Sequence, residues 1–217
     1  MTADYRTKAE KDAARRFASE TAKHQMTIVH DDGLHRTLRF ANPDNFLYWY
    51  EITTTPGQLV FSGDGDSFVF RLGDDMFKLF RRSAESGGIN ASYWAEKCRT
   101  GNAKSYSREQ FEQYVWKQVA DAEPYYRNLR DDVQKEIFES EVYDVDYESA
   151  ALMAVLGYTC HLTLRRDADG NRVPFRFRGV HEWDLQDYDW WYLFACHAIR
   201  HGIAAYDAAK AGEKAVA

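Results

Sequence analysis

The stretch between Met26 and Leu72 constrains the fold most, because strand-like segments follow one another there with very short connections. Apolar side chains such as Leu38 and Phe40 alternate with charged or polar ones, which is the period of a strand with one buried face. Parallel strands would need a crossover of about a dozen residues, which these turns cannot supply. The sequence therefore predicts an antiparallel meander of about five strands. The expected strands are residues 26–30, 34–40, 46–54, 58–62 and 67–72.

After Gly73 the hydrophobic period becomes that of a helix and remains so over most of the following chain. Turn-forming residues at 167–171 interrupt it and predict a late hairpin near residues 162–178. The expected helices are residues 4–23, 74–82, 91–99, 107–122, 125–140, 147–156 and 185–210. The predicted fold class is therefore α+β, with a helical C-terminal half packed on an N-terminal antiparallel β-meander.

The domain organisation expected from the sequence is a single domain over residues 1–217. The chain has 45% hydrophobic and 15% aromatic residues, enough for a large core, and it shows no internal repeat and no low-complexity linker. Within this domain we expect an N-terminal helix at 1–24, the sheet at 25–72 and a mainly helical part at 73–212.

Composition argues against nucleic acid and membranes as partners and favours a cytoplasmic location. A net charge of −6 is unlike that of a protein that grips nucleic acid over a broad face, so no direct nucleic-acid binding is expected. No apolar run reaches the roughly 18 residues of a membrane-spanning helix, and the start of the chain has no apolar signal core. The three cysteines, Cys98, Cys160 and Cys196, form no CxxC pair. These features predict no membrane association, free thiols and a cytoplasmic location.

The most informative feature for function is a block of carboxylates between residues 131 and 148, in which Lys135 is the one basic side chain. Clustered carboxylates repel one another and weaken folding unless water or cations meet them. The block is therefore either a solvated surface or a docking surface for a basic partner. The candidate partner-binding residues are Asp131, Asp132, Glu136, Glu139, Glu141, Asp144, Asp146 and Glu148.

Several arginines lie in the expected hairpin and form a positively charged patch, opposite in sign to the acidic block. Arg176 and Arg178 share one face of a strand, because side chains two residues apart point the same way. Guanidinium groups in this arrangement suit a small anion, or they pair with the acidic block of the same or another chain. The candidate anion-binding residues are Arg165, Arg172, Arg176 and Arg178.

Three histidines are candidates for a metal or acid–base site. His197 and His201 lie four residues apart on an expected helix, which places both imidazoles on one face, and His181 lies a short distance upstream. The pair lacks the intervening Glu of the zinc-protease motif, so a packed His197 and a surface His201 are the alternative. The sequence also shows no Walker loop and no GxSxG, and we expect no cofactor and favour a non-enzymatic role.

Several motifs together are similar to an uncharacterised family of proteins that phages and prophages encode. The similarity lies in residues 35–40, 49–57, 63–64, 68–70, 75–77, 90–97 and 192–207, so it spans most of the chain beyond residue 24. That family has no assigned activity or catalytic residues. The resemblance implies an accessory factor that acts on a bacterial host, in whose cytoplasm it would be found.

Three hypotheses for function follow. The first is a phage accessory protein that binds and inhibits a host defence protein, in the manner of an anti-CRISPR or anti-restriction factor, through the acidic block. Its partner would be a host protein with a basic surface, of which a nucleic-acid-binding defence complex is one candidate. The alternatives are a small metal-dependent hydrolase or nuclease that uses the three histidines, and a binder of a small anionic nucleotide that uses the hairpin arginines. A homo-oligomer is left open.

Overall fold

The computed structural model describes residues 8–85 and 88–216, without the side chains of residues 82–85 and 213–216. The chain divides into two compact units, one formed by Met1–Lys104 with Tyr188–Ala217 and the other by Ser105–Asp187. Each unit has a hydrophobic core of its own. This division does not test whether residues 1–217 fold as a single domain, so that expectation stays a prediction.

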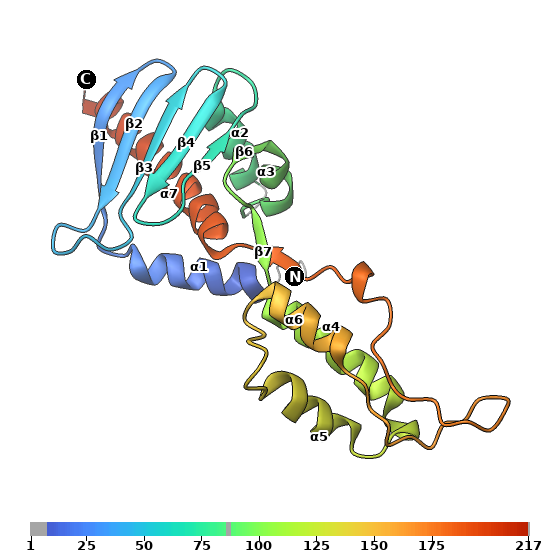
Figure 1. The fold of residues 1–217 in the computed structure, drawn as a ribbon. Helices are drawn as coiled ribbons and strands as arrows, with labels where there is room; N and C mark the ends of the chain where they lie inside the picture. Colours follow the sequence, from blue (N-terminus) through green and yellow to red (C-terminus); the bar gives the residue numbers. More distant parts are fainter. Residues whose placement is uncertain (1–7, 86–87, 217) are drawn as a thin grey trace. The chain divides into compact units, whose positions relative to one another are not determined.

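An antiparallel sheet forms the centre of the first unit, which confirms the predicted meander (Figure 1). Its strands follow in the order β1-β2-β3-β4-β5-β6. Their bounds are β1 Gln25–Asp32, β2 His35–Ala41, β3 Tyr50–Thr55, β4 Gln58–Gly63, β5 Phe68–Phe70 and β6 Cys98–Thr100. Every neighbouring pair in this order is antiparallel.

Alternation along the strands produces one apolar face. Every second residue from β2 to β5 is almost completely buried, whereas the residues between them are mostly half-buried or exposed. The apolar members of this buried set are Leu38, Phe40, Tyr50, Ile52, Leu59, Phe61, Phe68 and Phe70. Strand β1 lies at an edge and buries none of its residues completely.

Helix α7 (Trp190–Val216) lies along the apolar face and contacts β2 and β3. Figure 1 shows it crossing behind the strands, and its Phe194 ring packs within 6.4 Å of the Phe61 ring, centroid to centroid. The other helices of this unit are α1 (Lys8–Glu20), α2 (Met76–Glu85) and α3 (Ala91–Lys97), all three of which contact α7. Residues 4–7 of the expected first helix lie outside the described residues.

The strand expected at 46–54 starts later, at Tyr50. Residues Phe46 and Leu47 are exposed in a loop, and Tyr48 has a positive φ of 57°, which a strand does not allow. Side-chain oxygens hold this loop, because Asn45 accepts the N–H of Leu47 at 3.0 Å and Asp64 accepts that of Tyr48 at 3.0 Å. A run of large apolar residues resembles a strand, but these hydrogen bonds favour a turn.

The second unit is mainly helical. Its elements are α4 (Arg108–Ala122), η1 (Glu123–Tyr125), α5 (Leu129–Val133), the π-helix η2 (Gln134–Phe138), α6 (Glu148–Gly157) and η3 (Val180–Glu182). Phe111, Val115 and Val119 of α4 are fully buried at a spacing of four residues, so one face of α4 enters the core. Strands β7 (Lys104–Tyr106) and β8 (Gln186–Tyr188) pair with each other where the chain leaves and rejoins the first unit.

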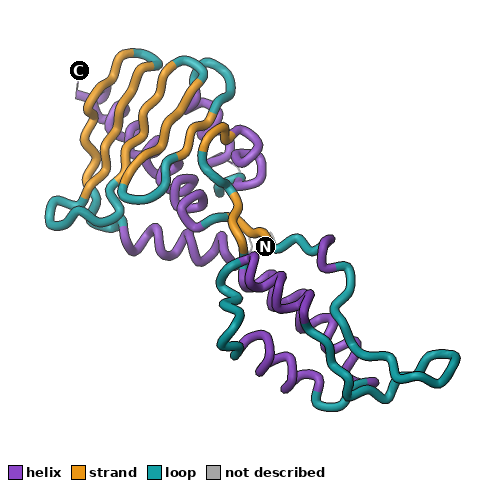
Figure 2. Tube along the Cα trace, in the orientation of Figure 1, coloured by secondary structure: helices purple, strands orange, loops and turns teal. Residues whose placement is uncertain are grey.

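The helix expected over 125–140 is interrupted. Asn128 has a left-handed φ of 53° immediately before α5, and the helix then changes to π geometry at Gln134. The expected hairpin at 162–178 is an extended loop, drawn in teal in Figure 2, with isolated antiparallel bridges in place of continuous strands. One of those bridges joins Cys160 to Phe175, which exchange backbone hydrogen bonds of 3.1 and 2.9 Å.

Candidate functional site

Residues 105–187 carry the whole net negative charge of the protein. This unit contains 17 acidic and 10 basic side chains, a formal net charge of −7, whereas the whole chain has −6. The first unit therefore has a formal charge of about +1. A charge concentrated on one compact unit creates a local potential that attracts cationic molecules.

The structure places the predicted acidic residues in α5, η2, the loop that follows and the first turn of α6. Seven of the eight are exposed, and Asp132 is half-buried. Asp132 accepts a short hydrogen bond from the hydroxyl of Tyr158. Asp146 forms an ion pair of 2.7 Å with Arg108. Among the described residues, Asp146 is the one member of the block with an ion pair, so most of these carboxylates face solvent unneutralised.

The loop between η2 and α6 is held in one conformation by local hydrogen bonds. The hydroxyl of Tyr106 donates to the carbonyl of the buried Val145 at 2.8 Å. Ser140 Oγ accepts the N–H of Val142 at 3.1 Å, and the carboxylate of Asp144 accepts the N–H of Asp146 at 3.1 Å. The backbone that carries the carboxylates of this loop is therefore ordered before a partner binds. Less conformational entropy is then lost on binding.

Electrostatic effects on Tyr106 show that several acids gather around the start of α4. Burial raises the pKa of Tyr106 to about 12; Arg108 opposes this rise, and the carboxylates of Asp146, Glu148 and Glu112 add to it. Glu112 also forms a 2.9 Å ion pair with Arg108, four residues earlier. Arg108 thus lies among three carboxylates, those of Glu112, Asp146 and Glu148.

An apolar pocket of about 480 Å³ lies beside this group, with Glu148 at its edge. Its other walls come from α6 and from residues 177–185, and they include Leu156, Phe177 and Trp183. Apolar side chains remain exposed on the same unit, and they include Val142, Tyr147, Met153 and Leu156, the last of which is 69% exposed. Exposed apolar side chains bordered by charges are typical of protein interaction surfaces.

The four predicted anion-binding arginines do not pair with the acidic block in the part of the chain that the structure describes. Arg165, Arg176 and Arg178 line a different cavity of the second unit, and Arg172 does not line it. Arg176 and Arg178 are exposed while Phe175 and Phe177 are buried. The predicted common face of Arg176 and Arg178 is therefore present.

The three predicted metal-binding histidines lie in both units. His181 is exposed at the edge of the apolar pocket, 3.5 Å from the Glu182 carboxylate. His197 packs against the ring of Phe17, and His201 Nδ1 lies 2.8 Å from the hydroxyl of Tyr50. Over residues 8–85 and 88–216, no group of three or more His, Cys, Asp or Glu side chains could hold a metal ion.

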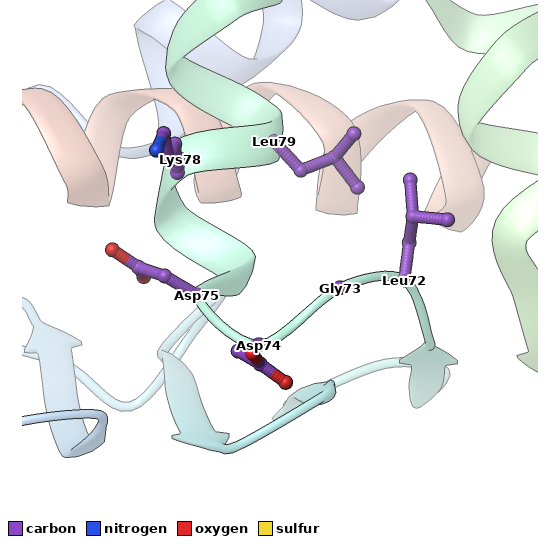
Figure 3. A pocket seen from close by; sticks show the side chains of 6 residues that line it. All are labelled: Leu72, Gly73, Asp74, Asp75, Lys78 and Leu79. Carbon is purple, nitrogen blue, oxygen red and sulfur yellow. The ribbon is translucent and has the colours of Figure 1, made fainter.

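A further hollow of about 370 Å³ lies where β5 leads into α2 (Figure 3). Figure 3 shows Leu72 and Leu79 on one side of it and Asp75 on the other. The Asp75 carboxylate is already engaged, because it accepts the N–H of Phe77 at 3.1 Å and pairs with Arg36 at 3.0 Å. Asp75 therefore stabilises the start of α2. The other polar side chains that line this hollow are those of Asp74 and Lys78.

Sequence reasoning missed Arg108 and Glu112, although their spacing of four residues is the usual signal of an ion pair on a helix. It also missed Tyr106 and the walls of the apolar pocket, because those contacts join residues far apart in the chain. Within the described residues, no helix has the length and apolar character to cross a membrane.

No family model, no curated protein and no solved structure matches this chain. The resemblance to phage-encoded proteins therefore stays a prediction.

Proposed function

We propose that this chain is a binding protein, without catalytic activity of its own, whose residues 105–187 dock a basic segment of a partner protein. The observation that carries the proposal is the combination of exposed carboxylates with an adjoining apolar pocket on one unit of formal charge −7. Acidic side chains would meet the cations of the partner, and the pocket by Leu156 and Trp183 would take its apolar residue.

The negative charge of the proposed docking surface indicates the kind of partner. Proteins that bind nucleic acid present lysines and arginines to the phosphates, and an acidic surface competes for those same side chains. We therefore propose that the partner is a nucleic-acid-binding host defence protein and that the chain is a phage-encoded inhibitor of it, of the anti-CRISPR or anti-restriction kind. The resemblance of segments within residues 35–97 and of residues 192–207 to phage-encoded proteins supports this finer assignment.

A charge-reversal variant tests the proposal. Asp144→Lys with Glu148→Lys should abolish capture of the partner, because both carboxylates border the surface and neither has an ion pair among the described residues. The matched control is Asp66→Lys with Asp169→Lys, which changes the net charge equally at exposed positions elsewhere. Each variant is used for affinity purification from bacterial lysate, and the captured proteins are quantified by mass spectrometry.

The partner found in this way is then purified and its affinity measured directly at increasing salt concentration. We expect a loss of affinity as salt screens the charges. The proposal predicts further that binding reduces nucleic-acid cleavage by the partner. Equal capture by the double variant and the wild type would contradict the assignment of the acidic surface.

A further inference from the structure

A second cavity of residues 105–187, separate from the proposed docking surface, has the opposite electrostatic character. Its volume is about 290 Å³, near the lower end of the usual range for ligand pockets, roughly 300–1,000 Å³. Three arginines and one carboxylate, Asp121, lie among its walls, together with aromatic side chains. The aromatic residues are Tyr125, Tyr126 and Phe175. The occupant that fits is therefore small and anionic.

Two of the arginines are held in place through their backbones. Gln118 Oε1 accepts the N–H of Arg178 at 2.9 Å, and Gln118 Nε2 donates to the Arg178 carbonyl at 2.7 Å. Thr163 Oγ1 accepts the N–H of Arg165 at 2.9 Å, and the Arg165 carbonyl accepts the N–H of Val173 at 3.1 Å. These hydrogen bonds fix the backbone positions of Arg165 and Arg178, although the loop that contains them has no regular strand.

The third arginine is directed by its neighbours. Phe175 and Phe177 are buried in the core of the unit, so the alternation of an extended chain turns Arg176 outward, on the same side as Arg178. No guanidinium group of the three forms an ion pair among the described residues. Arginine donates paired N–H groups that match the oxygens of phosphate, so phosphate is the anion that this set recognises best.

The cavity also has an aromatic wall that remains partly open. Tyr125 is 54% exposed, whereas Tyr126 is buried and donates its hydroxyl to the Val173 carbonyl at 3.1 Å. The Tyr125 carbonyl accepts the N–H of Leu164 at 2.8 Å, which anchors this residue beside the arginines. An exposed ring next to a phosphate-binding group is suited to stacking on a nucleobase.

We propose that this cavity binds a mononucleotide, with its phosphate on Arg165, Arg176 and Arg178 and its base on the ring of Tyr125. This site uses none of the acidic residues of the docking surface. Loss of nucleotide binding and loss of partner capture are therefore separate outcomes that separate substitutions produce.

The experiment is calorimetric titration of the full chain with AMP, inorganic phosphate and adenosine. AMP should bind, phosphate should bind more weakly, and adenosine should give no heat. Arg176→Gln with Arg178→Gln should weaken AMP binding roughly tenfold or more, because charge-assisted hydrogen bonds are lost. Tyr125→Ala should weaken AMP binding while leaving phosphate binding unchanged.

Arg172→Gln is the control, because Arg172 is an exposed arginine of the same loop that does not line the cavity. Its AMP affinity should equal that of the wild type, and thermal melts should show that all variants are folded. An equal loss in the control would mean that general positive charge binds AMP, and it would overturn the proposal. Equal affinity for phosphate and AMP would overturn the assignment of a nucleotide, as would absence of AMP binding.

Discussion

His201 shows how a single side chain of α7 meets the sheet. Its Nδ1 lies 2.8 Å from the hydroxyl of the buried Tyr50, and its ring contacts that of Phe40 edge to face. Loss of solvent around the ring lowers the pKa of His201 below its ordinary value of 6.5, and the neighbouring His24 lowers it further. Burial also lowers the pKa of His24.

This environment predicts that the protein loses stability on mild acidification. A histidine whose pKa is lowered by folding binds its proton more readily in the unfolded chain, so acid favours unfolding. The free energy of unfolding should be at its full value above about pH 6.5, and it should fall as the pH drops from there towards the lower folded pKa values. Denaturant titrations between about pH 7.5 and pH 5 measure this slope.

The substitution His201→Gln should flatten part of that pH dependence, because Gln does not titrate. The exposed His181 provides the matched control, His181→Gln. If both variants keep the slope of the wild type, the partial loss of solvent around the His201 ring does not contribute to that slope.

For individual residues, the sequence predicts that Arg176 and Arg178 share one face of an extended chain. It does not predict which other residues line the cavity next to them. The two-residue spacing of Arg176 and Arg178 is visible in the sequence because strand geometry is local. Gln118 and Tyr125 join them only through contacts across about forty to sixty positions of chain, which no local pattern encodes.

Among the elements, the contact of α7 with the sheet is unusually close at Gly202. A Cβ atom at this position would lie 2.5 Å from Ile52 Cδ1 and 3.1 Å from Phe40 Cε2, both in the buried core. Glycine is costly inside a helix, so its presence here is explained by the approach of β2 and β3.

The substitution Gly202→Ala should therefore lower the free energy of unfolding by about 1 to 2 kcal/mol, because the cost of overpacking exceeds the gain in helix propensity. Gly212 lies in the same helix with open space around its Cα, so Gly212→Ala is the control and should raise stability by up to about 1 kcal/mol. Chemical denaturation compares the two. A Gly202→Ala variant as stable as the Gly212→Ala variant would rule out the close packing.

The elements also show where sequence patterns suffice. Alternation and short turns predict β1 to β5 because each strand pairs with its neighbour in the chain. Strand β6 was not predicted, because Cys98–Thr100 is three residues long and pairs with β5 across an intervening pair of helices. The break at Asn128 depends on a left-handed backbone conformation that a helical pattern conceals.

For the whole molecule, the important feature is that the first unit is built from two separate stretches of chain. The backbone N–H of Asp189 donates to the carbonyl of Ala103 at 3.0 Å, so the two ends of that unit are adjacent. The division was not predicted, because the boundaries near 104 and 188 carry no glycine- or proline-rich linker.

A deletion tests the independence of the first unit. Replacing residues 105–187 by a short Gly-Ser linker should leave a folded protein, because the buried residues of its core all come from the retained stretches. Cooperative thermal melting and a near-ultraviolet circular dichroism signal from buried Trp94 and Tyr192 measure this. A deletion variant without cooperative melting would show that the core needs residues 105–187.

The order of the elements along the chain also has a consequence for synthesis. The ribosome completes the meander well before α7, and the whole of residues 105–187 is translated in between. At about 5–20 residues translated per second, the apolar face of the nascent sheet stays exposed to solvent for on the order of ten seconds before α7 is made. We therefore expect newly made chains to depend on ribosome-associated chaperones, and chains interrupted before α7 to collect in inclusion bodies.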